Sequence, residues 1–226
     1  MKYATRTAGS AAGIQHVSVA DNAPGGIVKR TFDIAAALSA IIFLSPLLIL
    51  LALLVKVTDR GPAFYGHTRI GRNGSHFKCL KFRTMVQNGA EVLDAHLRDN
   101  PAARAEWEST RKLKDDPRVT RVGNVLRKLS LDELPQLFNI LRGEMSVVGP
   151  RPVVSDELEK YGASVHSYLC ARPGLTGLWQ ISGRNDVSYA RRVQFDHFYV
   201  ENWSLAFDLL IIIRTLPAVI SSRGTY

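Results

Sequence analysis

The hydrophobic residues of the chain are concentrated in one long segment near its N-terminus. Residues 34–55 contain no charged side chain, and this length is sufficient for a helix to cross the hydrocarbon core of a bilayer. Ser45-Pro46 lies at the midpoint, where proline leaves the carbonyl of Ile42 without its helical hydrogen bond and bends the axis. The serine hydroxyl can bond to a carbonyl one turn earlier. The pattern predicts a membrane helix over residues 29–60 that is broken at Ser45-Pro46.

Cationic residues flank this segment on both sides, and they do not predict a direction of crossing. They are Lys29 and Arg30 before it, and Lys56, Arg60, Arg69 and Arg72 after it. We favour a helix that dips into the membrane and returns to the same side. A kinked single span stays open as an alternative, and a buried core helix is the third interpretation. Residues 1–28 lack periodicity and are predicted to form a flexible tail, not a signal peptide.

The pattern becomes extended after the membrane segment. Residues 63–70 and 76–84 flank an Asn-Gly pair, which is a strong signal for a β-hairpin. Alternation along the second strand places Lys81 and Arg83 on one face. These two cations have two interpretations, a cradle for a diphosphate or a solvated edge.

The remaining periodic segments predict helices. Residues 88–114 indicate two charged amphipathic helices, with Asn100-Pro101 as the N-cap and first position of the second. Residues 188–201 indicate another, in which Phe195, Phe198 and Tyr199 share an apolar face and Asp196 is a surface or ion-paired carboxylate. Residues 205–213 are apolar but too short to span, which favours a helix in the membrane interface, with a core helix as the alternative.

Composition changes this picture in two respects. The formal net charge of +9 indicates an anionic partner such as nucleic acid, acidic lipid or a phosphorylated substrate. The two cysteines, Cys79 and Cys170, are too few for a disulfide framework and suit a reducing compartment. The chain has no Cys or His pairing with the spacing of a zinc site.

The stretch from Arg127 to Pro152 contains the strongest candidate chemistry, two adjacent carboxylates at Asp132 and Glu133. Ser130 with Glu133 fits a capping box, which is a purely structural role. Proline at position 135 counts against that role, because it would fall inside the capped helix, whereas proline is favoured at a first helical position. A helix from Pro135 to about residue 142, ending at a glycine, would instead leave both carboxylates facing a cleft. Both interpretations stay open on the residues alone.

Arg151 lies between two prolines in the same stretch. Proline restricts its own backbone and that of the preceding residue, so this loop is expected to be stiff. A stiff loop lowers the entropic cost of holding a guanidinium ready for a phosphate. An arginine in a proline turn with no ligand is the alternative.

Three motifs and the membrane segment with Ser45-Pro46 together resemble the bacterial sugar transferases. These enzymes are the monotopic polyprenyl-phosphate phosphoglycosyltransferases that begin glycan assembly. The motifs are Lys-Phe-Arg-Thr-Met at 81–85, Leu-Asp-Glu-Leu-Pro-Gln at 131–136 and Val-Gly-Pro-Arg-Pro at 148–152. The resemblance runs from about residue 29 to the C-terminus. It is strongest to the short, exopolysaccharide-initiating undecaprenyl-phosphate galactose phosphotransferases, without the extra N-terminal spans of the long glucose-specific members.

The resemblance implies a fold and a location. The fold class is α+β, mainly helical, with a re-entrant N-terminal membrane helix, a small cytosolic catalytic domain that contains a β-hairpin, and interfacial amphipathic helices. The domains would be a tail at 1–28, the membrane helix at 29–60 and the phosphoglycosyltransferase domain at 61–226. The catalytic domain would face the cytosol at the bacterial inner membrane.

The resemblance also implies site residues and a reaction. Asp132 would be the nucleophile and Glu133 its partner in binding Mg²⁺. The implied substrate phosphate-binding residues are Lys81, Arg127, Arg151, Arg184 and Asp196. The expected partners are a UDP-sugar, galactose or glucose, then undecaprenyl phosphate and membrane lipids, without nucleic acid. The oligomeric state is open, a homo-oligomer included.

Two other functions remain as alternatives. One is a membrane-bound phosphohydrolase that uses the same carboxylates with water as the acceptor. The other is a non-catalytic basic module that binds nucleic acid or acidic lipid through its charge. The basic residues are scattered among prolines and carboxylates, which counts against the basic module.

Overall fold

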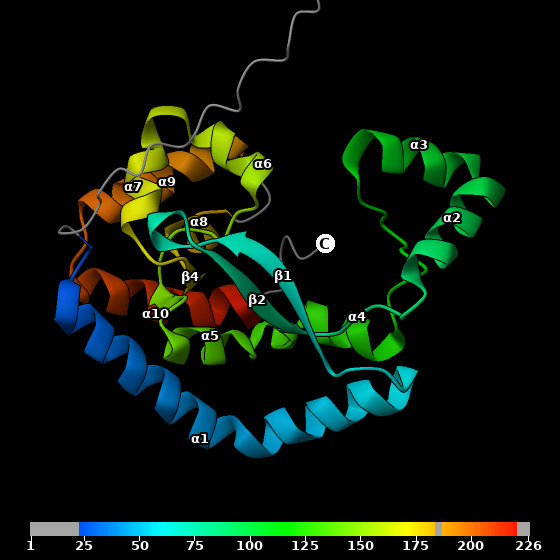
Figure 1. Ribbon diagram of the computed structural model, residues 1–226, viewed down its shortest axis with the longest axis horizontal. Helices are drawn as coiled ribbons and strands as arrows, with labels where there is room; N and C mark the ends of the chain where they lie inside the picture. The colour runs from blue at the N-terminus through cyan, green and yellow to red at the C-terminus, as the bar shows by residue number, and fades with distance from the viewer. Residues whose placement is uncertain (1–22, 184–186, 221–226) are drawn as a thin grey trace, which may run out of the picture.

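The structure is a computed structural model that describes residues 23–183 and 187–220. Its longest element is helix α1, Gly26–Asp59. Within the described residues, α1 is the one helix whose length and apolar composition would suffice to cross a membrane. The helix bends near its middle (Figure 1) and contains Pro46. The hydroxyl of Ser45 donates to the carbonyl of Ile42 at 2.9 Å, as the sequence predicts. The predicted break therefore takes the form of a bend in one continuous helix.

A β-hairpin follows α1. Strands β1, Phe64–Ile70, and β2, His76–Phe82, pair antiparallel. The 3-10 turn η1, Arg72–Gly74, joins them, with positive φ at Asn73 and Gly74. These residue types tolerate the left-handed region, and the hairpin prediction is confirmed. A second, parallel pair of short strands, β3, Ser146–Val148, and β4, Gly174–Thr176, was not predicted.

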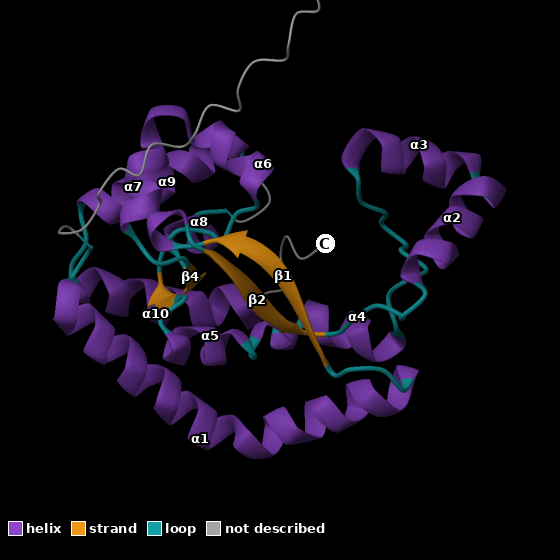
Figure 2. Cartoon of the chain, viewed as in Figure 1, coloured by secondary structure: helices purple, strands orange, loops and turns teal. Residues whose placement is uncertain are grey.

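Helices make up most of the remaining described chain (Figure 2). Helices α2, Gly89–Asp99, and α3, Pro101–Thr110, form an arm that stands apart from the rest (Figure 1). The Asn100 side chain accepts from the Ala103 amide at 3.1 Å, which confirms the predicted N-cap. The later elements are α4 (Arg121–Lys128), η2 (Leu131–Glu133), α5 (Gln136–Arg142), α6 (Ser155–Leu158), η3 (Glu159–Ser164), α7 (Val165–Cys170), α8 (Leu178–Ile181), α9 (Tyr189–Glu201) and α10 (Leu205–Ile220).

Part of the core lies between the concave side of α1 and the hairpin. In the N-terminal half of α1, Ala37 packs with Phe77 and Cys79 of β2 and with α5. Toward its C-terminal half, residues of α1 pack against Phe82 and Leu126. Burial raises the pKa of the Cys79 thiol to about 11, so this cysteine is an inert core side chain. The fold is thus mainly helical with small sheets, in agreement with the predicted class.

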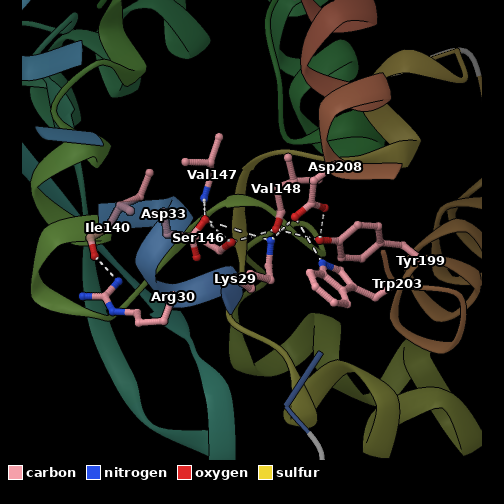
Figure 3. A network of polar contacts seen from close by, with 10 residues as sticks. All are labelled: Lys29, Arg30, Asp33, Ile140, Ser146, Val147, Val148, Tyr199, Trp203 and Asp208. Carbon is pink, nitrogen blue, oxygen red and sulfur yellow. Dashed lines mark hydrogen bonds and ion pairs between the residues drawn. The ribbon is translucent and has the colours of Figure 1, made fainter. Parts of the chain in front are cut away.

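Polar contacts attach both ends of α1 to the rest of the chain. At the N-terminal end, Lys29 forms a buried ion pair with Asp208 of α10 at 2.7 Å (Figure 3). Asp33 accepts from the Ser146 hydroxyl and the Val147 amide at 2.9 and 3.0 Å. At the other end, Asp59 pairs with Arg83 at 3.1 Å. Both ends of the apolar helix therefore contact the same folded unit.

The outer surface of α1 remains apolar and exposed. Ile27, Ile42, Phe43, Ile49 and Val57 are each more than 60% exposed. Helix α10 also has two different faces, because Ile211 is buried while Leu209, Leu210 and Ile213 are exposed. The buried face agrees with the core-helix alternative, and the membrane-interface alternative stays a prediction.

Candidate active site

Asp132 and Glu133 lie in the 3-10 turn η2, and they do not form the capping box. Ser130 has a positive φ of 55° and makes no side-chain cap. Helix α5 starts at Gln136, with Pro135 as its N-cap, and ends at Gly143 with a φ of 82°. The capping-box interpretation is therefore wrong, because the chain turns before the helix begins. The prediction of a helix that begins at the proline and stops at Gly143 is confirmed to within one residue.

Lys81 at the end of β2 contacts both carboxylates. Its ammonium group lies 2.7 Å from Glu133 Oε1 and 3.7 Å from Asp132 Oδ2. The Asp132 side chain is 11% exposed, whereas that of Glu133 is 35% exposed. One carboxylate is thus held in a sheltered position beside a fixed cation, and its neighbour faces the solvent more openly. Lys81 therefore pairs with the two carboxylates, and it does not belong to a solvated strand edge.

Burial dominates the ionisation of Asp132. It raises the pKa of this carboxyl, because the charged form loses water, while Lys81 favours the charged form and lowers it. Glu133 raises it further by like-charge repulsion. Arg127 also lies close enough to lower it. Asp132 is therefore a carboxylate whose charge depends on the cations around it.

Arg127 of α4 is held in place by a side-chain contact with Thr84. Its Nε donates to Thr84 Oγ1 at 2.9 Å, and the Thr84 carbonyl accepts from the Thr120 amide at 3.0 Å. Gly123 packs directly against the Thr84 backbone, with no room for a side chain. The glycine therefore permits the close approach that places Arg127 near Asp132.

Arg151 belongs to a second cluster. Its guanidinium pairs with Glu157 at 3.0 Å and lies over the Trp179 ring, 5.7 Å from the ring centroid. No described contact joins Arg151 to Asp132 or Glu133. His67 of β1 lies within electrostatic reach of both Lys81 and Glu157, so the two clusters border the same hairpin.

Asp196 is a positioning residue and not a surface carboxylate. It is 2% exposed and accepts from the Tyr161 hydroxyl at 2.8 Å and the Arg151 amide at 3.3 Å. Burial raises its pKa to about 7. The prediction of a surface or ion-paired carboxylate is wrong, and Phe198, predicted on the apolar face, is 52% exposed. Asp196 therefore holds the backbone of the proline-flanked loop at Arg151 through this amide contact.

The other predicted positions fall elsewhere. Arg184 lies outside the described residues. Ser45 and Pro46 lie in α1, where they shape the helix. The contacts of Lys29 with Asp208, and of Asp33 with β3, were missed by sequence reasoning. A lone acidic residue within the apolar run of residues 205–213 is the signal that could have indicated them.

The donor set for a metal consists of the two carboxylates of η2. Among the described residues no group of three or more Asp, Glu, His or Cys side chains could enclose an ion. This set suits Mg²⁺, which is commonly bound by one or two carboxylates together with substrate phosphates and water. The more exposed Glu133 is the better placed of the two to share an ion with a substrate.

Comparisons with known proteins agree with this arrangement. The family described as bacterial sugar transferase matches residues 25–222. The chain is 63% identical to the exopolysaccharide production protein ExoY of Sinorhizobium fredii, over all of both chains. It is 58% identical to the undecaprenyl-phosphate galactose phosphotransferase of Salmonella typhimurium, over 88% of this chain and 42% of that protein. It is 40% identical to the UDP-glucose:undecaprenyl-phosphate glucose-1-phosphate transferase of Caulobacter vibrioides, over 88% of this chain and 72% of that protein.

Proposed function

The chain belongs to the bacterial sugar transferase family and is a transferase, and from this premise we propose that it transfers a sugar-1-phosphate from a UDP-sugar to undecaprenyl phosphate. UMP is the leaving group, and the lipid-linked product starts an exopolysaccharide. The observation that carries the proposal is the sheltered Asp132 carboxylate with Lys81 at 3.7 Å and Arg127 close by. The names of the relatives support galactose ahead of glucose, because the galactose phosphotransferase is the more similar of the two.

The reaction proceeds in two displacements at one phosphorus. An oxygen of Asp132 attacks the phosphorus that carries the sugar, and the bond from this phosphorus to the UMP oxygen breaks, with its electron pair leaving on UMP. The product is an aspartyl phosphosugar. A phosphate oxygen of undecaprenyl phosphate then attacks the same phosphorus and releases the Asp132 carboxylate. No net proton is consumed in either displacement.

The cations around Asp132 serve this chemistry through charge. A carboxylate and a diphosphate repel one another, so attack requires positive charge beside the transferred group. Lys81 lies where it can neutralise both carboxylates in the resting site and then contact the incoming phosphates. Arg127 is fixed by Thr84 and adds a second cation. Arg151 holds a more distant position, suited to another part of the substrate.

Mg²⁺ fits the site as an ion shared between Glu133 and the substrate. When bound it would supply charge neutralisation for the diphosphate. Glu133 already bonds Lys81 at 2.7 Å, so its carboxylate is positioned toward the reacting region. Asp132, the more buried carboxylate, stays available as the nucleophile.

We also propose that α1 is re-entrant and that the rest of the chain lies on the cytosolic face of the inner membrane. Lys29 and Asp59, near opposite ends of α1, both bond residues of the same folded unit. Two ends that contact one polar unit lie on one side of the bilayer. The bend at Pro46, with its carbonyl contact from Ser45, supports this path. The apolar acceptor lipid stays in the membrane beside the site.

Membership of a transferase family counts against the alternative of a non-catalytic basic module. A phosphohydrolase remains the chemical rival, since water can also attack an aspartyl phosphosugar. Release of free sugar phosphate in the absence of lipid would favour it. Formation of the lipid-linked product from the trapped intermediate favours the transferase.

The decisive experiment uses a UDP-sugar radiolabelled in the sugar, with purified protein and Mg²⁺. Label retained on denatured wild-type protein, absent from Asp132→Asn and discharged by undecaprenyl phosphate, is the expected result. Retention by Asp132→Asn would remove Asp132 from its role. Parallel reactions with UDP-galactose and UDP-glucose identify the sugar.

Topology is tested separately with single cysteines placed at Lys56 and Ala23, one near each end of α1. Both natural cysteines are buried, which limits background labelling. A membrane-impermeant thiol reagent should label neither site in intact cells and both sites in inverted vesicles. Opposite labelling of the two sites would contradict the re-entrant path.

A further inference from the structure

A cleft lies beside the N-terminal end of α1, and none of its lining residues belongs to the active site. Its volume is about 350 Å³, and its lining includes Arg30, Arg72 and Arg172 together with Ile27 and Thr31. Three guanidiniums thus come from the membrane helix, the hairpin turn and the loop before β4. Segments distant in sequence have brought three positive charges to one opening.

No carboxylate of the described residues forms an ion pair with these arginines, and Asp33 offsets the charge of Arg172 only in part. Within the residues that the structure describes, none of the three arginines forms an ion pair with Asp or Glu. Arg30 donates to the carbonyls of Ile140 and Leu141 at 2.7 and 3.0 Å, the first of which Figure 3 shows. Arg172 donates from Nε to the Gly143 carbonyl at 2.8 Å. These contacts to neutral carbonyl groups hold the Arg30 and Arg172 side chains in place without an ion-pair partner.

Two further observations indicate that the cleft suits an anion. The Nε atom of Arg72 is buried and has no hydrogen-bond partner, and a buried donor without a partner is costly. Burial lowers the pKa of Arg172, and the neighbouring Arg30 and Arg72 lower it further. An anion in the cleft would relieve the repulsion between the three guanidiniums.

The surroundings of the cleft indicate which kind of anion binds. Ile27, part of the lining, is 85% exposed, and the neighbouring Val28 is 60% exposed. Both belong to the outer apolar surface of α1. Positive charge therefore meets the apolar surface at the level where the proposed membrane helix leaves the bilayer, which is where lipid phosphates lie.

We propose that Arg30, Arg72 and Arg172 bind the phosphate of an anionic membrane phospholipid, whose acyl chains lie along α1 beside Ile27. The site is distinct from the one that binds the transferred phosphate, because Lys81 and Asp132 border the opposite half of the α1 core. The bound lipid fixes the depth and rotation of the helix at its N-terminal end. The proposal does not depend on the identity of the sugar or on the covalent intermediate.

The test is a titration of the full-length protein in detergent with short-chain phosphatidylglycerol, followed by native mass spectrometry. The expected Kd of Arg72→Gln is about tenfold weaker than that of wild type, the scale of one charged hydrogen bond. Arg60→Gln is the matched control, because it removes an exposed arginine at the other end of α1, and its affinity should be unchanged. Arg72→Lys, which keeps the charge, should lie between wild type and Arg72→Gln.

Equal affinity of wild type, Arg72→Gln and Arg60→Gln would overturn the proposal. Equally tight binding of short-chain phosphatidylcholine would do so as well, because a site for net negative charge discriminates between the two headgroups. Displacement of phosphatidylglycerol by equimolar undecaprenyl phosphate would assign the cleft to the acceptor lipid and overturn the phospholipid assignment. Thermal unfolding of each variant separates loss of binding from loss of folding.

Discussion

Lys29 Nζ lies 2.7 Å from Asp208 Oδ2, although the two residues are 179 positions apart. Both side chains are buried. Asp208 also accepts from the Tyr199 hydroxyl at 2.7 Å and from Trp203 Nε1 at 3.1 Å. The ion pair therefore fixes the first turn of α1 to the last described helix of the chain.

Removal of Lys29 should destabilise the protein strongly. Lys29→Met leaves the buried Asp208 charge without its cation, which typically costs about 3–5 kcal/mol. Thermal unfolding in detergent measures the effect. The double variant Lys29→Met, Asp208→Asn should recover part of the loss, because it removes the uncompensated charge. Equal unfolding temperatures for wild type and Lys29→Met would show that the pair contributes nothing.

Replacement of Lys81 should slow formation of the covalent intermediate and shift its pH dependence. Lys81→Gln removes a cation that favours the charged form of Asp132, so the pKa of Asp132 rises. The nucleophile must be deprotonated, and the acid limb of the rate profile therefore moves to higher pH. We expect a rate loss of about 10²–10³-fold, with a smaller loss for Lys81→Arg. Single-turnover labelling across a pH series measures both effects, and an unmoved acid limb would contradict the role of Lys81.

Asp196 should make stability depend on pH. Its pKa is about 7 in the folded protein against an ordinary value of 3.8. Between these values the folded state binds a proton that the unfolded state has lost, so stability falls as pH rises through this window and levels off above it. The expected slope is up to about 1.4 kcal/mol per pH unit. Asp196→Asn should lack this component, and parallel urea unfolding from pH 4 to 8 compares the two proteins. Identical profiles would contradict a raised pKa.

A methyl group added at position 123 should disturb Arg127 indirectly, through Thr84. The added Cβ of Gly123→Ala clashes with the carbonyl of Thr84, whose hydroxyl holds Arg127. We expect a stability loss of about 1–3 kcal/mol together with reduced labelling of Asp132. Asn124→Ala, an exposed position on the same helix, is the control and should change neither quantity. Normal labelling by a folded Gly123→Ala would show that Arg127 does not depend on this contact.

Local signals predicted much of the fold. The Asn-Gly turn, the Asn100 cap, the Gly143 end of α5 and the Ser45 contact with Ile42 all depend on residues within a few positions of one another. The Ser130 cap failed although it is also local, because the proline-compatible 3-10 turn replaced the helical start. The parallel pairing of β3 with β4 was missed because strands of three residues are too short to show an alternating pattern.

The candidate site was predicted in part. Lys81, Asp132 and Glu133 lie together as the motifs suggested. Arg151 lies in a separate cluster, and Asp196 is buried beneath it. Whether a charged side chain is buried or exposed depends on contacts between residues tens of positions apart in the sequence, such as the contact of Tyr161 with Asp196. Periodicity along one helix does not contain that information.

The distance in sequence between Lys29 and Asp208 has a consequence for biosynthesis. At about 5–20 residues per second, translation needs roughly 10 to 40 s to reach Asp208 after Lys29 has been made. During that interval α1 forms without its distant partner. Pro46 and the contact between Ser45 and Ile42 are in place as soon as the helix forms, so both can bend it from the start. The bend of α1 therefore follows from its own local geometry, and the ion pair with Asp208 fixes the N-terminal end afterwards.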